Sequence, residues 1–269
     1  MREFRLRTSH RPRPLPSGRW VMTQRWNDLL FAHWPIPATA IAPFIPEGLK
    51  VDIFQGSAWL GVVPFWMDSI RMRGVPPVPG ANRFPELNLR TYVSDERTGT
   101  PGVWFFSLDA GSLLAVLFAR SFFRLPYYWA DMRLEQQDER DFHYVSRRRM
   151  TSRPVIFQAR YRGLGPTRRL AESLPGSLEY FLTERYCLFT RDRDGHPMRA
   201  NIYHVPWPLE EAEADIERND LADAVGISLP NVPPVLHYSR RLAVYVWQLE
   251  RVRAARGAQR IPATAVPST

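Results

Sequence analysis

The stretch FPELNLRTYV, residues 84–93, alternates in polarity with the two-residue period of a β-strand. One side of this strand is formed by two leucines, a threonine and a valine. The other side collects a carboxylate, an amide, a guanidinium and a phenol, on Glu86, Asn88, Arg90 and Tyr92. Such a polar row either faces water or lines a polar pocket.

The segment that follows indicates that the row is covered. After the polar turn SDERTGTPG, the run VWFFSLDA (residues 103–110) is apolar on both faces, which is typical of a strand in a sheet that is covered on both sides. We expect residues 85–93 and 103–109 to form a hairpin. The groups of the polar row then need partners, because an unpaired buried polar group costs on the order of 1–3 kcal/mol.

Two interpretations without a ligand remain open. Taken alone, the stretch favours a half-exposed strand whose charges are solvated. If the row is enclosed, Glu86, Asn88 and Arg90 can form a network, since residues two apart on one face lie roughly 7 Å apart and long side chains span that distance. In that case Glu86 and Arg90 can simply satisfy each other in the wall of a barrel.

The rest of the chain predicts many short strands and few helices, and the 25 prolines favour short elements that end in turns. The expected elements are a short helix in 37–49, two strands joined at 55–57 within 50–67, a largely buried helix over 112–122 that begins at Ser112, strands at 127–135, 141–150 and 153–162, a helix followed by a strand in 177–190, a strand, a turn and a helix over 198–216, and a long strand over 235–250. The fold class predicted is mainly β, a barrel-like domain with a few short helices packed on it.

The composition limits the classes of protein to which the chain can belong. Hydrophobic residues make up 45% and charged residues 23%, as in soluble globular proteins. No apolar run approaches the roughly 20 residues of a membrane span, and the N-terminus has no apolar signal region, so we expect a cytoplasmic protein. One cysteine, Cys187, and six histidines without ligand spacing predict no metal and no disulfide. Motifs of the common hydrolases, NTPases and dinucleotide-binding proteins are absent, and we expect no cofactor.

The net charge of +9 is concentrated at the two ends of the chain. Residues 1–19 carry +5 and residues 251–269 carry +4, so that 20–250 is close to neutral. We therefore expect one domain over 20–250 between two flexible basic tails. Contact of these tails with nucleic acid is the less favoured interpretation, and no specific nucleic-acid partner is expected. The sequence leaves the oligomeric state open, a homo-oligomer included.

Further polar residues in apolar surroundings extend the candidate site. They are Arg120 and Tyr127 around a Leu-Pro turn, Tyr186 in TERYCLF, and His204 in HVPWPL. Apolar walls with a few placed polar groups are typical of ligand pockets. In this interpretation Arg90 holds an anion, and Tyr92, Asn88 and His204 orient a substrate oxygen. Glu86 acts as acid or base if burial raises its pKa.

The chain resembles the YqjF-like family of bacterial proteins, a domain of unknown function, over roughly residues 20–250. The matching stretches are WNDLLFAHWPIP, PEGLKVDIFQGSAWLGVVPF, ELNLRTYV, GVWFFSLDA, ARSFFRLPY, TERYCLF and HVPWPL. The resemblance implies the acetoacetate decarboxylase-like fold, a β-barrel-like architecture around a central pocket.

The chemistry of acetoacetate decarboxylase does not carry over with the fold. That enzyme forms a Schiff base through a lysine, whereas the only lysine here, Lys50, follows a Pro-Glu-Gly turn that indicates an exposed position. Arginine stays protonated and cannot replace it. The sequence favours a protein that binds a small anionic or oxo-acid ligand without Schiff-base chemistry. The alternative is a lyase, isomerase or hydrolase that uses Glu86 as acid or base and Arg90 as anion anchor.

Overall fold

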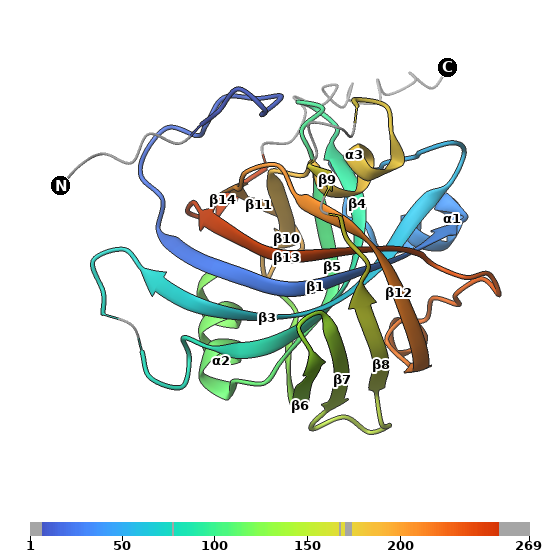
Figure 1. Cartoon of the computed structure of the whole chain (residues 1–269). Helices are drawn as coiled ribbons and strands as arrows, with labels where there is room; N and C mark the ends of the chain where they lie inside the picture. The colour runs from blue at the N-terminus through green and yellow to red at the C-terminus, as the bar shows by residue number, and fades with distance from the viewer. Residues whose placement is uncertain (1–6, 77, 167, 170–173, 253–269) are drawn as a thin grey trace, which may run out of the picture.

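The computed structural model describes residues 7–76, 78–166, 168–169 and 174–252. The strands are β1 (Met22–Ile36), β2 (Leu49–Val51), β3 (Ala58–Met72), β4 (Phe84–Asp95), β5 (Pro101–Ala110), β6 (Tyr127–Asp138), β7 (Asp141–Arg148), β8 (Ile156–Gly163), β9 (Arg168–Arg169), β10 (Cys187–Arg191), β11 (Pro197–Tyr203), β12 (Pro208–Asn219), β13 (Val235–Val246) and β14 (Glu250–Arg251) (Figure 1). The helices are α1 (Ala38–Ile41), α2 (Leu113–Phe122) and α3 (Leu178–Thr183), with short 3-10 turns at Ala42–Phe44 and Asp223–Val225.

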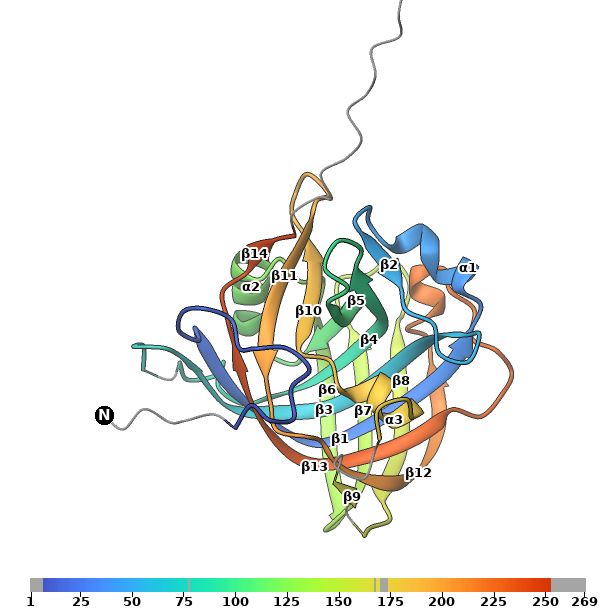
Figure 2. The same cartoon turned by 90° about the horizontal axis from the view of Figure 1, so that it is seen from above.

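The described strands form one branched sheet that closes into two rings. The first ring has nine strands, in the order β5, β6, β7, β8, β12, β13, β1, β3 and β4, and is closed by the pairing of β4 with β5. The second ring runs β5, β10, β11, β13, β1, β3 and β4. The sheet branches because β5 pairs with β10 near its start and with β6 near its end. Likewise, β13 pairs first with β12 and then with β11 (Figure 2).

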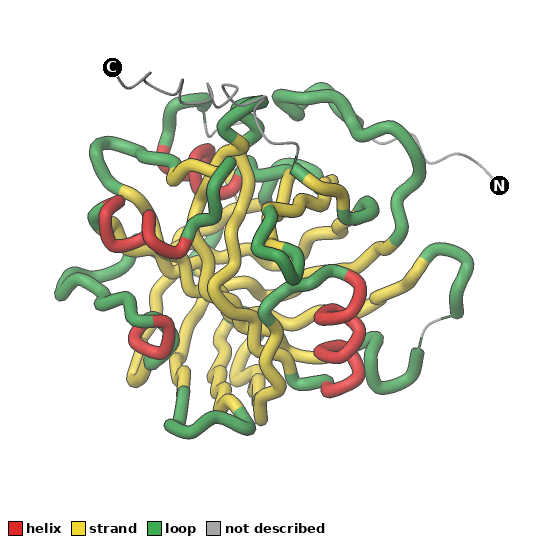
Figure 3. Tube along the Cα trace, turned by 180° about the vertical axis from the view of Figure 1, so that it is seen from behind, coloured by secondary structure: helices red, strands yellow, loops and turns green. Residues whose placement is uncertain are grey.

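The five strands that both rings share, β13, β1, β3, β4 and β5, carry a core on each face. Alternation along β1 sends Leu29 and Phe31 to one core and Leu30 and Ala32 to the other. The second of these cores is filled by side chains of β7, β8 and β12. The first is bounded by β10, β11 and α2. Figure 3 shows the helices on the outside of this framework of strands. The mainly β, barrel-like fold expected from the sequence is confirmed.

The hairpin that decided the fold is present as predicted. Strand β4 pairs antiparallel with β5, from Glu86 opposite Ala110 to Ser94 opposite Pro101, with one bulge between Leu89 and Arg90. Nearly every residue of β4 is buried. The interpretation of the polar row as a solvated, half-exposed strand is therefore wrong. The meander of β6, β7 and β8 and the succession of α3 and β10 are also confirmed.

Two predicted elements differ from the structure. The predicted turn at 55–57 is present and is closed by an isolated antiparallel bridge between Phe54 and Ser57, but β2 and β3 do not pair with each other. They lie end to end along one edge of β4, because β3 leaves the last residues of β4 free for β2. Residues 208–219 form strand β12 and not a helix. The Glu- and Ala-rich run there favours a helix locally, but residues 209–211 pair with β13 and residues 212–219 pair with β8. Arg162 of β8 also forms an ion pair with Glu213.

Helix α2 begins where the sequence predicts but is not largely buried. The Ser112 side chain accepts a hydrogen bond from the Ala115 N–H, which caps the helix. Within the helix only Val116 is buried, whereas Leu114 and Leu117 are 55% and 54% exposed. The apolar residues of α2 thus cover a cavity on one side and face outward on the other.

The described part of the N-terminal segment lies against the barrel. His10 contacts the backbone oxygen of His204 at 2.9 Å, and the Arg11 guanidinium donates to the Ile202 carbonyl at 2.8 Å and lies over the Tyr186 ring. His10 and Arg11 therefore pack on the barrel, whereas the sequence predicts a flexible tail over 1–19. The tail expected at 251–269 falls outside the described residues from position 253 onward. No helix in the described ranges is long and apolar enough to cross a membrane.

Closure of the second ring depends on Gly102, and we expect Gly102→Ala to destabilise the protein by about 1–3 kcal/mol. A Cβ at this position would lie 2.5 Å from the Cys187 carbonyl oxygen and 2.6 Å from the Phe189 ring. The β10 backbone would have to shift away from β5. Urea denaturation measures the loss, with Gly111→Ala as the control, since its Cβ would lie 3.2 Å from Pro85. Equal stability of the two variants would contradict the prediction.

Candidate ligand-binding site

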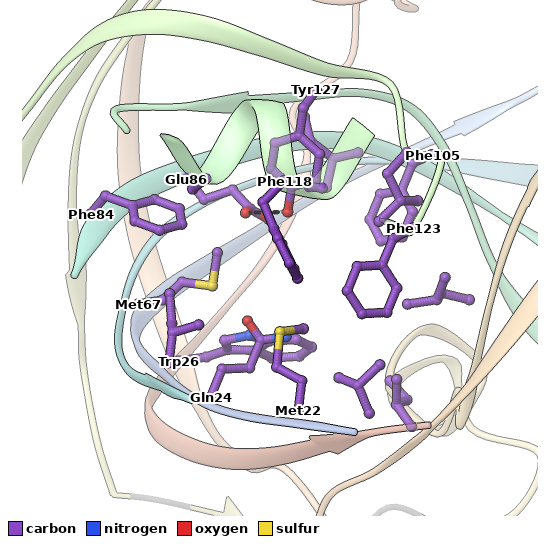
Figure 4. A pocket seen from close by; sticks show the side chains of 18 of the residues that line it. Met22, Gln24, Trp26, Met67, Phe84, Glu86, Phe105, Phe118, Phe123 and Tyr127 are labelled. Carbon is purple, nitrogen blue, oxygen red and sulfur yellow. Dashed lines mark hydrogen bonds between the residues drawn. The ribbon is translucent and has the colours of Figure 1, made fainter. Parts of the chain in front are cut away.

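A cavity of about 370 Å³ lies on the face of the shared sheet that α2 covers. Each of the seven strands of the second ring contributes a side chain to its wall, and α2 and the β3–β4 connection complete it. Most of the wall is apolar, including Trp26, Met67, Phe84, Phe105, Phe118 and Phe123 (Figure 4). Its size falls in the range of small-molecule pockets.

Four of the eight residues predicted from the sequence line this cavity. They are Glu86, Arg90, Tyr127 and His204. Two members of the polar row of β4, Glu86 and Arg90, therefore reach the cavity.

Glu86 and Tyr127 form a hydrogen-bonded pair in the cavity wall. The Tyr127 O–H donates to the Glu86 carboxyl group at 2.6 Å, as Figure 4 shows. Burial raises the pKa of Glu86 to about 8, against the opposing effect of the hydrogen bonds from Tyr127 and Asn88. Burial also holds the pKa of Tyr127 well above its usual value. With a pKa of about 8, Glu86 is mostly protonated at neutral pH, so it holds a proton that it can donate.

Arg90 is a buried guanidinium without an acidic partner. Its side chain lies in the cavity wall, with the residue 7% exposed. Of its five N–H donors, the only one with a hydrogen-bond acceptor in the described parts of the chain is on Nη2, which meets the Tyr92 oxygen at 3.5 Å. No described carboxylate lies within ion-pair distance of it. The ring of Phe31, 5.3 Å away, offers a cation–π contact and not a counter-charge.

Arg185 also lines the cavity and was missed as a site residue, although it precedes the predicted Tyr186. Unlike Arg90, it is compensated: its guanidinium forms an ion pair with Asp52, and its Nε donates to the Phe181 carbonyl at 2.7 Å. The signal for it was the alternation in TERYC, which sends Thr183 and Arg185 to one side and their neighbours to the other.

The other four predicted residues do not line the cavity. Arg120 lies on the exposed side of α2, and its Nε donates to the Tyr127 carbonyl at 2.7 Å. Tyr92 is fully buried beside Arg90, with its hydroxyl 2.6 Å from Nε2 of His33. Asn88 lies between Glu86 and Arg90 on β4 and is buried. Tyr186 lies under the N-terminal segment, where its hydroxyl donates to Glu184.

The remaining candidates for chemistry lie outside the cavity. Lys50 is exposed on β2. Cys187 is buried, and burial raises the pKa of its thiol to about 12. One group of metal-ligand type occurs in the described ranges, Asp192, Asp194 and His196 in the β10–β11 turn. The Asp192 carboxylate already accepts hydrogen bonds from two backbone N–H groups of that turn, so these three residues lie together because of the structure of the turn.

Comparisons with known proteins agree with this architecture. Residues 23–243 match DUF2071, a family described as an uncharacterized conserved protein. The uncharacterized protein YqjF of Bacillus subtilis (strain 168) is 44% identical over 237 residues, which cover 88% of this chain and 95% of YqjF.

Solved structures share the fold at low sequence identity. An acetoacetate decarboxylase-like enzyme from Sphingomonas wittichii RW1 matches with a TM-score of 0.60 and 10% identity, over 88% of this chain and 95% of that one. The enduracididine biosynthesis enzyme MppR, complexed with pyruvate, matches with a TM-score of 0.58 and 12% identity, over 88% and 92%. The chain therefore belongs to the DUF2071 family of YqjF-like proteins and has the acetoacetate decarboxylase-like fold.

Proposed function

We propose that this protein binds a small carboxylate or related oxo-anion in the cavity, with Arg90 as the anchor and without Schiff-base chemistry. The observation that carries the proposal is the buried guanidinium of Arg90, which has no acidic partner. A lone buried charge is costly. The carboxylate of a ligand supplies both the missing charge and the acceptors for the free N–H groups.

Two further observations support this function. The described residues of the cavity wall include no lysine, so an amine for a Schiff base is lacking there. In addition, the structural neighbour MppR was solved with pyruvate, a small oxo-acid. At 12% identity this agreement extends to the fold and not to individual residues.

Thermal unfolding in the presence of small carboxylates and oxo-acids tests the proposal. A ligand at 100 times its dissociation constant adds about 2.7 kcal/mol to the stability, which corresponds to a rise in Tm of roughly 5–10 °C for a domain of this size. We expect this rise in the wild type and in Arg71→Gln, whose arginine is exposed on β3 and outside the cavity. We expect none in Arg90→Gln. An equal rise in all three proteins would exclude Arg90 as the anchor.

A second candidate function is an acid–base enzyme on the same site, favoured by the Glu86–Tyr127 pair. A carboxyl group with a pKa of about 8 that faces a cavity is a competent general acid near neutral pH. If the protein turns over a bound oxo-acid, Glu86→Gln removes the turnover and keeps the binding. Turnover unchanged in Glu86→Gln would leave this pair without a catalytic role.

A further inference from the structure

We infer that the ligand is a monocarboxylic acid with an apolar body of medium length, its carboxylate on Arg90 and its body along the cavity toward Glu86. This inference rests on the proposed function and deepens it by naming the class of ligand. It follows from the lining of the cavity, the number of free charges in it, its size and the nature of its entrance.

The lining is too apolar for a ligand that is polar throughout. Phe105, Leu108, Leu125 and Leu188 belong to the apolar wall, and Leu108 and Phe105 lie on β5 opposite Asn88 and Arg90. A keto, hydroxyl or amino group placed against these side chains would lose its hydrogen bonds to water without replacement. Methylene or aromatic groups there gain burial instead.

Among the described residues that line the cavity, one charge is uncompensated, that of Arg90. The charge of Arg185 is balanced by Asp52. The imidazole of His204 is neutral near pH 7, because burial lowers its pKa to about 4. Tyr127 already donates to Glu86, so the Tyr127 hydroxyl needs no acceptor from the ligand. A dianion such as a dicarboxylate or a phosphate monoester would therefore bury a second negative charge without a partner.

The size of the cavity limits the ligand. A volume of about 370 Å³ holds roughly 12 non-hydrogen atoms, if each takes the 30 Å³ or so of a water molecule in the liquid. A carboxylate uses three of these atoms, and the remainder corresponds to roughly nine more carbons. Glu86 and Arg90 are four residues apart on β4, which places their Cα atoms roughly 13 Å apart along the strand. Both residues line the cavity, so a chain anchored at Arg90 has room to extend toward Glu86.

The entrance is apolar as well. The entrance is defined by lining residues that are exposed: Pro76, together with Val75 at 49%, Val78 at 51% and Leu114 at 55%. The Ser112 hydroxyl donates to the Gly80 carbonyl at 2.7 Å and joins the β3–β4 connection to α2 beside this entrance. The apolar body of the proposed ligand is compatible with such an entrance, because it has no polar groups that would lose their hydrogen bonds there.

Calorimetric titration with straight-chain acids from acetate to dodecanoate tests the inference. We expect the affinity to rise about fourfold per methylene up to roughly the ten-carbon acid that fills the cavity, and to fall beyond it. Octanedioate is expected to bind at least about tenfold more weakly than octanoate. Octanol, which has the same chain without the charge, is expected to bind weakly.

The outcomes separate this inference from the proposed function. Acetate and pyruvate that bind as tightly as octanoate would overturn the apolar body and leave the anion site intact. Octanol that binds as tightly as octanoate would overturn the anion site. An absence of binding by every compound would overturn both.

A pair of variants on α2 tests the location of the body. Ala119→Phe adds bulk to a residue of the cavity wall, and Ser121→Phe adds the same bulk to an exposed position two residues later. We expect Ala119→Phe to shorten the preferred chain while binding of butyrate persists. Ser121→Phe is expected to keep the wild-type preference. Identical chain-length profiles for the two variants would place the body outside this cavity.

Discussion

The stability of the wild type relative to Glu86→Gln is expected to fall by on the order of 5 kcal/mol between pH 4.5 and pH 8. Glu86 is buried, and its pKa in the folded protein is raised from 4.5 to about 8. Between these two values the unfolded chain has lost the Glu86 proton and the folded protein keeps it. The folded state thus binds more protons, and its stability decreases as the pH rises. Glutamine has no proton to lose.

Urea denaturation of both proteins from pH 4.5 to pH 8 measures this difference. The subtraction removes the contributions of Asp109 and Glu184, whose pKa values burial also raises. Glu96→Gln, in an exposed turn, is the control and is expected to follow the wild type at every pH. A constant difference between the wild type and Glu86→Gln across this range would show that Glu86 titrates as an exposed carboxyl group does.

Two arginines of the same cavity are expected to respond to the same substitution with opposite signs. Arg90→Met removes a buried charge that has no acidic partner, and we expect the ligand-free protein to become more stable by about 1–4 kcal/mol. Arg185→Met removes one partner of the ion pair with Asp52 and leaves that carboxylate without its counter-charge, with the Ser94 hydroxyl still donating to it. We expect a loss of about 3–5 kcal/mol.

Guanidinium chloride denaturation without ligand measures both effects, and each variant is the control for the other. Arg90→Met also loses the cation–π contact with Phe31, which reduces the expected gain in stability without reversing it. A residue whose removal raises the stability of the ligand-free protein is typical of a binding site, where function is kept at the expense of stability. A loss of stability in both variants would mean that Arg90 holds the barrel wall together and has no need of a ligand.

The buried polar row could be predicted because strand alternation and the apolar neighbouring strand act together. Alternation places Glu86 and Arg90 on one face, and the apolar segment 103–110 requires that face to be covered. The pair between Glu86 and Arg90 that we considered does not form, since Glu86 is bonded to Tyr127 and Arg90 lies four residues along the strand. The spacing alone argues against that pair.

Other features depend on contacts that the sequence does not display. The place of β12 is set by its pairing with β8, which overrides a helix-favouring run. Tyr186 and Arg185 are neighbours in the chain but lie on opposite sides of a wall, and only the path of β10 decides which one meets the cavity. Similarly, Arg120 is on the outer side of α2 because the inner side is taken by Ala119 and Phe118.

A crystal structure of the protein with octanoate shows directly whether Arg90 anchors a carboxylate. We expect density for the acid in the cavity, with a carboxylate oxygen about 2.7–2.9 Å from a guanidinium nitrogen of Arg90 and the chain directed toward Glu86. Octanoate bound outside the cavity, or with its carboxylate at the Glu86–Tyr127 pair while Arg90 contacts protein atoms alone, would contradict this expectation.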